Sequence, residues 1–250
     1  MSDRSPFGTR LSRLLAYRLS AAPTKADEVV TAFARDSGLP ESELAGLLAG
    51  AQPSSEILRT LGSALGIPAA DMFVIASLPV PDDLASAWKT TPWHVGTIVE
   101  TAAGMPPAQI ARLDELVRSL PLQARTTPPP PDTYPDGPGA VVSRLMMNRN
   151  IAPYAAKALY FVGGGPLVSY STVGQLGTGK VTLTPRYVTA FAHVLGYAPG
   201  DLVAITGVGP VPQGQPRHRS AAQIAALAWN ARHLTSDQIR HVLDSTRRIS

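Results

Sequence analysis

Cysteine is absent from this chain of 250 residues. Its absence excludes a disulfide scaffold, a thiolate zinc site and a cysteine nucleophile, and it fits a reducing cytoplasm. Long hydrophobic runs are absent as well, because no stretch of about 18 uncharged apolar residues occurs, and no membrane span is expected. The arginine-rich start of the chain has no apolar stretch long enough for a signal peptide. These absences predict a cytoplasmic protein.

Motifs of catalytic and metal-binding chemistry are also missing. The sequence contains no HExxH, CxxC or Walker pattern, and its five histidines have no partners at metal-ligand spacing. The glycine-rich stretch 163–166 lacks the Lys-Ser/Thr that follows in a phosphate loop, so we interpret it as a turn. His193 falls on an apolar helix, where a buried, hydrogen-bonded histidine is expected. We therefore predict that the protein is not an enzyme and has no catalytic residue, cofactor or metal.

Positive charge is modest overall but unevenly distributed. The net charge is +4, yet residues 1–131 hold 11 Lys and Arg against 13 Asp and Glu, whereas residues 132–250 hold 11 against 5. A basic half beside a mildly acidic half indicates that only the second half meets a polyanion. The alternative is a solvated surface whose charge is merely uneven.

The sequence repeats itself at a spacing of about 130 residues. In the clearest block, Leu65-Gly66, Asp71 and Pro79-Val80-Pro81 correspond to Leu195-Gly196, Asp201 and Pro210-Val211-Pro212. Upstream, residues 11–18 resemble 142–149, and downstream, residues 108–120 resemble 237–249. Three separated blocks that keep their order and nearly one offset predict a duplicated architecture.

Hydrophobic periodicity predicts an all-α fold. Apolar residues recur at helical spacing, and no convincing period-two strand pattern occurs. Four glycines stand where helices should end: Gly38, Gly66, Gly163 and Gly196. Each copy resolves into about five short helices and a two-helix hairpin. The predicted parts are a first unit at 1–81, a hairpin at 82–123, a proline-rich linker at 124–139, a second unit at 140–209 and a C-terminal hairpin at 210–250.

The segment from Val168 to Val203 resembles the helix-turn-helix core of the lambda-repressor/Cro (XRE-type) bacterial regulators. The features that carry the resemblance are a Ser-rich helix start at 169–172, the apolar residues Val173 and Leu176, a Gly179-Lys180 turn and a helix stop at Val194-Leu195-Gly196. In the first copy, residues 39–73 offer Gly50 at the turn and Leu65-Gly66 at the stop. The resemblance implies two tandem lambda-repressor-like helix-turn-helix domains, each followed by a helical hairpin.

This resemblance implies a sequence-specific transcriptional regulator that binds double-stranded DNA, mainly through the second copy, and is associated with the nucleoid. Ser169 is expected to cap the recognition helix, and its neighbours are expected to face base edges in the major groove, where a glutamine can pair with adenine. The following turn and nearby arginines would hold phosphates. The expected DNA-contacting residues are Ser169, Tyr170, Ser171, Thr172, Gln175, Thr178, Lys180, Arg186, Arg144 and Arg149.

The first copy departs from this pattern. Its corresponding helix offers Glu41, Ser42, Glu43 and Gly46, and Ala51 stands in place of the lysine. Carboxylates suit the positive end of a helix dipole but repel DNA phosphates. A glutamate can still read cytosine. We interpret the first copy as a degenerate unit that serves as scaffold or in dimerisation, with an acidic surface that could take a protein partner.

Two other classes of function stay open. One is a protein-interaction module built on a helix-turn-helix fold that has lost DNA binding, which the acidic first copy favours. The other is a ligand-sensing regulator in which Trp88, Trp93 and Trp229 line a pocket, although aromatic residues on helix hairpins are more often part of a core.

The C-terminal hairpin predicts an assembly surface. Its two helices carry apolar stripes that a lone hairpin cannot cover, formed by Ile224, Leu227, Ala228, Ile239, Val242 and Leu243. The stripes could pack on the hairpin of the first copy, or on the same hairpin of a second subunit. With one base-reading helix per chain, we expect a homodimer on a pseudo-palindromic site.

Overall fold

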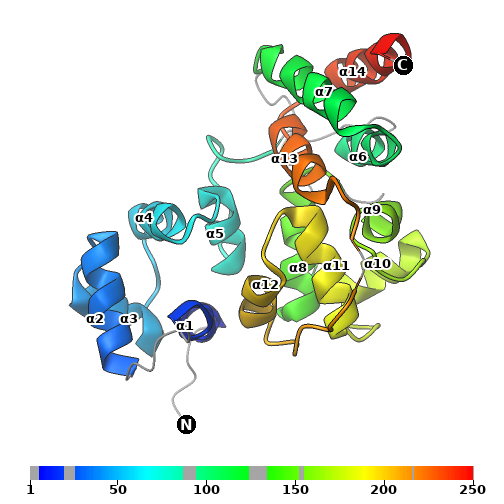
Figure 1. The fold of residues 1–250 in the computed structure, drawn as a ribbon. Helices are drawn as coiled ribbons and strands as arrows, with labels where there is room; N and C mark the ends of the chain where they lie inside the picture. Colours follow the sequence, from blue (N-terminus) through cyan, green and yellow to red (C-terminus); the bar gives the residue numbers. More distant parts are fainter. Residues whose placement is uncertain are drawn as a thin grey trace.

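The computed structural model describes residues 6–19, 26–86, 94–123, 134–151, 155–215 and 217–249 (Figure 1). These ranges contain fourteen α-helices and no β-strand. The predicted all-α fold class is therefore confirmed for the part of the chain that the structure describes.

Helices of the first half form a five-helix unit and a hairpin. Unit 1 comprises α1 (Pro6–Leu19), α2 (Ala26–Ser37), α3 (Glu41–Ala49), α4 (Ser55–Leu65) and α5 (Ala69–Ile75). Hairpin 1 comprises α6 (Val95–Ala103) and α7 (Pro107–Ser119).

The second half has the same order of helices, a five-helix unit followed by a hairpin. Unit 2 comprises α8 (Pro138–Met147), α9 (Ala155–Phe161), α10 (Tyr170–Gly177), α11 (Pro185–Leu195) and α12 (Pro199–Thr206). Hairpin 2 comprises α13 (Ala221–Ala231) and α14 (Ser236–Ile249). The helices α3, α4 and α5 begin 129 or 130 residues before α10, α11 and α12, respectively, so the helix order repeats at the spacing of the sequence repeat.

The linker predicted at residues 124–139 ends earlier than predicted, because α8 already begins at Pro138. Pro138 and Gly139 form the first turn of α8, where proline is favoured because the amide N–H that it lacks would have no helical partner. Residues 124–133 of the predicted linker lie outside the described residues. Among those described, no single helix is long and apolar enough to cross a membrane, and α4 and α5 pass that test only as a pair bent by 114°.

Several helix ends lie at the predicted signals. Gly66 and Gly196 adopt the left-handed conformation directly after α4 and α11, which a residue with a Cβ rarely adopts. At the start of α14, Thr235 and Gln238 form a capping box: Thr235 Oγ1 accepts from Gln238 N at 3.4 Å, and Gln238 Oε1 accepts from Thr235 N at 3.0 Å. Local signals thus set the lengths of these helices.

The two hairpins pack against each other. Both α13 and α14 lie on α6 and α7, at the top of Figure 1. Of the two packing partners expected for hairpin 2, the structure shows the hairpin of the same chain. The stripe on which the homodimer expectation rested is therefore covered within the chain, with Ile224, Leu227, Ala228, Ile239 and Val242 in the core and Leu243 partly buried.

Units 1 and 2 pack reciprocally. Helix α1 lies on α12, and α5 lies on α8. Since α1 corresponds to α8 and α5 to α12, each unit offers the same pair of helices to the other. Equivalent helices accordingly lie on opposite sides of this contact in Figure 1, with α2, α3 and α4 at the left and α9, α10 and α11 at the right. This is the pattern of a two-fold symmetric dimer interface, formed here within one chain.

Candidate nucleic-acid interface

Helix α10 is held against the core of unit 2 by one face. Val173 and Leu176 are buried, as the sequence predicted. Helix α8 approaches so closely that a Cβ on Gly139 would collide with the carbonyl group of Leu176, which explains the glycine at that position. The opposite face of α10 is consequently turned to solvent.

The N-terminus of α10 carries a cluster of hydroxyl groups. Ser169 caps the helix, since its Oγ accepts from Thr172 N at 3.2 Å. The same Oγ lies 2.7 Å from Ser171 Oγ and 2.9 Å from Thr172 Oγ1. The cap prediction is therefore confirmed, and the cluster presents several donors and acceptors at the positive end of the helix dipole.

The predicted base-reading residues lie on one exposed surface. Ser169, Tyr170, Ser171 and Gln175 are exposed, and Thr172 is half-buried. Thr178 is also half-buried, and its Oγ1 donates to Gln175 O at 3.2 Å, so it shapes the end of α10. The structure thus brings the α10 residues of the prediction together on the outer face of unit 2.

Not all of the predicted phosphate-binding cations of unit 2 are exposed to solvent. Lys180 and Arg186 are exposed, and neither side chain has an ion-pair partner among the described residues. Arg144 is mostly buried, donates to Tyr134 O at 2.7 Å and lies 3.6 Å from the Asp136 carboxylate. Of these predicted cations, Lys180 and Arg186 are therefore the two with exposed side chains.

The prediction that Arg149 contacts DNA is wrong in this structure, because its side chain is only 2% exposed. Its two terminal nitrogens donate to the fully buried Asp71 carboxylate at 3.1 and 2.8 Å. One of these nitrogens also donates to Leu195 O at 2.9 Å, and the guanidinium packs 5.1 Å from the ring centroid of Trp229. Arg149 holds unit 2 on unit 1 instead.

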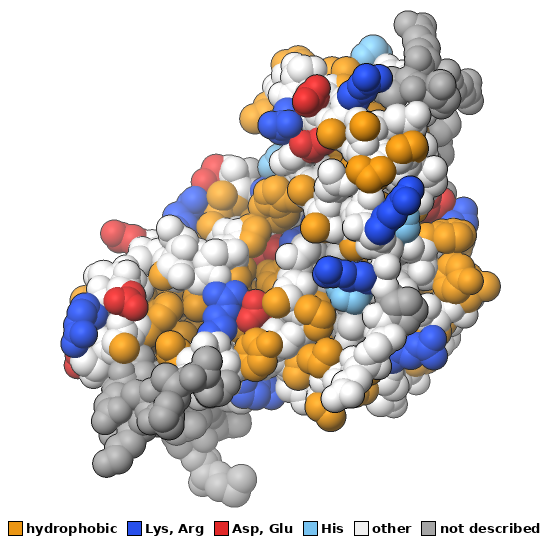
Figure 2. Space-filling model, viewed as in Figure 1, with side chains coloured by type: hydrophobic (Ala, Val, Ile, Leu, Met, Phe, Trp, Pro, Cys, Tyr) orange, Lys and Arg blue, Asp and Glu red, His pale blue; other side chains and the backbone are white. Residues whose placement is uncertain are grey.

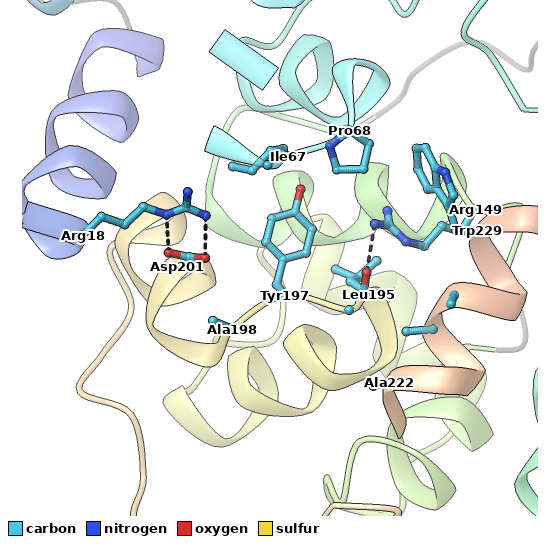
Figure 3. Close-up of a pocket in the computed structure, with 14 residues that line it drawn as sticks. Arg18, Ile67, Pro68, Arg149, Leu195, Tyr197, Ala198, Asp201, Ala222 and Trp229 are labelled. Atoms are coloured by element: carbon cyan, nitrogen blue, oxygen red, sulfur yellow. Dashed lines mark hydrogen bonds and ion pairs between the residues drawn. The ribbon is translucent and has the colours of Figure 1, made fainter. Parts of the chain in front are cut away.

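A second ion pair mirrors that of Arg149. Arg18, at the matching end of α1, donates to both oxygens of Asp201 at 2.9 and 2.8 Å and also contacts Leu65 O. Each arginine thus binds the last carbonyl of the fourth helix in its own unit and the aspartate of the fifth helix in the other unit. Figure 3 shows Arg18 with Asp201 on one side of the contact and Arg149 on the other.

A cavity of about 330 Å³ lies on this contact (Figure 3). Its walls include four pairs of equivalent residues from the two units: Arg18 and Arg149, Gly66 and Gly196, Ile67 and Tyr197, and Pro68 and Ala198. Helix α13 closes one side with Trp229 and three alanines. The cavity therefore straddles the pseudo-two-fold axis. Trp229 is the only tryptophan of the expected pocket that can be placed, since Trp88 and Trp93 lie outside the described residues.

Sequence reasoning missed two basic residues on a segment that contacts the end of α9 and the start of α11. The segment before α13 runs back along unit 2, where His218 N donates to Val162 O at 3.1 Å and Gln215 Nε2 donates to Arg186 O at 3.1 Å. Arg217 and Arg219 are exposed on this segment. The Arg-His-Arg run was the signal, but only the backbone contact places it next to unit 2.

Exposed apolar side chains gather around the connection between α9 and α10. Tyr160, Phe161, Leu167 and Tyr170 are among the few large hydrophobic residues that are exposed in the described chain, and Leu167 is 71% exposed. Tyr160 and Phe161 meet edge to face, with ring centroids 5.1 Å apart. Figure 2 shows hydrophobic side chains at the right edge of the view, where α9 and α10 lie in Figure 1. A solvent-exposed apolar patch of this kind is typical of a binding surface.

The equivalent surface of unit 1 has the opposite charge. Glu41, Ser42 and Glu43 are exposed at the start of α3, and Gly46 is half-buried. Helix α3 contains no Lys or Arg. The acidic character predicted for the first copy therefore lies on the position equivalent to the hydroxyl-rich start of α10.

Groups that would support other chemistry are few in the described ranges. No cluster of three or more His, Asp or Glu there could hold a metal ion. His193 is buried and its Nδ1 lies 3.0 Å from Gly163 O, which agrees with the structural role expected for it. Comparisons with known protein families, curated proteins and solved structures found no match for this chain.

Proposed function

We propose that the chain is a non-enzymatic DNA-binding regulator in which α9 and α10 form a helix-turn-helix and α10 enters the major groove. The observation that carries the proposal is the outer face of α10, with a capped N-terminus and exposed Ser171, Tyr170 and Gln175. Exposed Lys180 and Arg186 follow in the next turn and at the start of α11. Base-reading side chains at a helix start, flanked by phosphate-binding cations, are what major-groove recognition requires. The proposal includes a tandem arrangement, with unit 1 as a second, degenerate helix-turn-helix.

Two substitutions test the separate phosphate-binding and base-reading roles that we propose for this surface. Lys180→Ala removes one phosphate contact, so binding to every duplex weakens and the slope of log K against log salt falls by about one. Gln175→Ala removes a base contact, which costs roughly 1–3 kcal/mol at a selected site and relaxes its sequence preference. A salt-titrated gel shift, first on sheared genomic DNA and then on selected duplexes, measures both.

The matched control is Arg59→Ala, which removes an exposed cation of unit 1 that pairs with Asp83 at 2.8 Å. We expect its salt slope to equal that of the parent protein. Equal weakening by Lys180→Ala and Arg59→Ala would reject the phosphate role of Lys180. Equal loss of selected and random duplexes by Gln175→Ala would reject its base-reading role.

A protein-binding surface is the second candidate, and the apolar patch of Tyr160, Phe161, Leu167 and Tyr170 is the observation that favours it. A partner held by this patch would be lost on Leu167→Ser and little affected by salt, because apolar burial drives the association. DNA binding has the opposite dependence on salt. The gel shift therefore separates the two functions, since the second predicts no shift of DNA at low salt.

A further inference from the structure

The two equivalent helices α3 and α10 differ in what they offer to DNA. They occupy matching positions on either side of the contact between the units, as the reciprocal pairs Arg18–Asp201 and Arg149–Asp71 require. In a two-fold dimeric regulator, these are the positions of the two recognition helices. Here one position carries hydroxyl and amide groups with cations nearby, and the other carries two exposed glutamates.

The reciprocal contact also removes the need for a second chain. Unit 1 already covers the helices of unit 2 that a symmetric partner would cover, because α8 and α12 are packed on α5 and α1. The apolar stripe of hairpin 2 is covered in the same way by hairpin 1. Within the described residues, the surfaces that a partner subunit would take are thus occupied by the other half of the chain.

We infer that unit 1 stands in place of the second subunit, so that one chain binds one half-site, and that the glutamates of α3 keep the adjacent half-site unbound. The inference rests on the proposed function of α10. In a symmetric dimeric regulator the two recognition helices meet adjacent half-sites about 34–36 Å apart, one turn of DNA, and we extend that arrangement to α10 and the matching face of unit 1. Carboxylates there repel phosphates and restrict the contact to one side.

Charge reversal on α3 tests this inference through a gain of binding rather than a loss. Glu43→Lys in the full chain should bind a fluorescein-labelled random 40-base-pair duplex roughly 3–10-fold more tightly at moderate salt, with a salt slope steeper by about one. Glu41→Lys/Glu43→Lys should add to both effects. Its nuclease footprint should extend by about 10 base pairs beyond that of the parent on a selected site.

Glu56→Lys is the matched control, because Glu56 is also an exposed glutamate in the first turn of a unit 1 helix, α4. It changes the net charge equally but lies off α3, so we expect a smaller gain and no longer footprint. Equal gains for Glu43→Lys and Glu56→Lys, or an unchanged footprint in the double variant, overturn the inference. A complex with two chains on one parental site also overturns it.

The outcome separates this inference from the proposed function. Suppose that the parent protein binds DNA with a salt slope that Lys180→Ala lowers, but that the α3 variants behave like Glu56→Lys. The proposed function of α10 then stands, and the role proposed for α3 is rejected. A parent protein that shifts no duplex at low salt overturns both.

Discussion

Two ion pairs cross the contact between the two units, and the pairs differ in burial. Asp71 and Arg149 have side chains 0% and 2% exposed, whereas Asp201 and Arg18 are 11% and 31% exposed. Asp71 also accepts hydrogen bonds from Asn148 Nδ2 at 2.7 Å and Tyr197 Oη at 2.9 Å. The two ion pairs are therefore equivalent in position but unequal in energetic weight, because solvent screens only the outer one.

This difference predicts the effect of removing each carboxylate. Asp71→Asn leaves the Arg149 guanidinium buried without a counter-charge, so the free energy of unfolding should fall by about 3–5 kcal/mol. Asp201→Asn is the symmetry-matched control, and because Arg18 can turn to water it should cost about 1 kcal/mol. Chemical denaturation of both variants measures the difference. Equal losses would mean that the burial asymmetry has no energetic consequence.

At this scale the sequence distinguishes types of side chain but not their surroundings. Arg149 and Arg186 are both arginines in the basic half, yet one is sealed between the units and the other is exposed. No periodicity reveals that the partner of Arg149 lies in the other copy, although Asp71 and Asp201 were visible as matching positions of the repeat. The exposed residues of α10 could be predicted because helical periodicity separates them from Val173 and Leu176.

At the scale of elements, the helix ends show which structural features could be predicted from the sequence. One helix end also makes the stability of the fold depend on pH. Glycine stops and the Ser169 cap are local, so the sequence alone indicates them. The cap of α6 is different, since His94 is buried and its Nδ1 accepts from Gly96 N at 3.0 Å. Burial lowers the pKa of His94 from 6.5 to about 4. Nothing in the local sequence indicates that a histidine would be buried there.

The lowered pKa of His94 predicts a loss of stability in mild acid. Between pH 6.5 and about 4 the unfolded chain binds a proton that folded His94 does not, so stability falls as the pH falls through this window. One such group contributes a slope of at most about 1.4 kcal/mol per pH unit. The pKa of His233 is also lowered to about 4, by burial and then by Arg232, and it adds to the effect.

Thermal unfolding at a series of pH values tests this. His94→Asn keeps a capping acceptor but cannot titrate, so its melting temperature should fall less between pH 7 and pH 5 than that of the parent. His241→Asn, at an exposed position on α14, is the control and should leave the parental pH dependence intact. A parental pH dependence in the His94→Asn variant would contradict the prediction.

The arrangement of the whole molecule is determined by the contacts between the two copies of the repeat. The repeat predicts two similar halves, but it leaves open whether they face each other or a second chain, because both arrangements bury the same stripes. The structure places α1 on α12, α5 on α8 and hairpin 2 on hairpin 1. Arg149 in the second half therefore depends on Asp71 in the first. Truncation to a single half would expose the helix faces with which that half packs on the other.

Cutting the chain between the halves should consequently leave them together. A protease site inserted within residues 124–133 and then cleaved yields two fragments that retain every contact between α1 and α12, α5 and α8, and the two hairpins. Because these contacts include the buried Arg149–Asp71 pair, the fragments should co-elute at micromolar concentration as one species near the 26.3 kDa of the intact chain. Adding Asp71→Asn should weaken their association, since breaking a buried pair costs several kcal/mol, at least about 3. Fragments that separate on cleavage alone would show that the linker, rather than the reciprocal interface, holds the two halves in place.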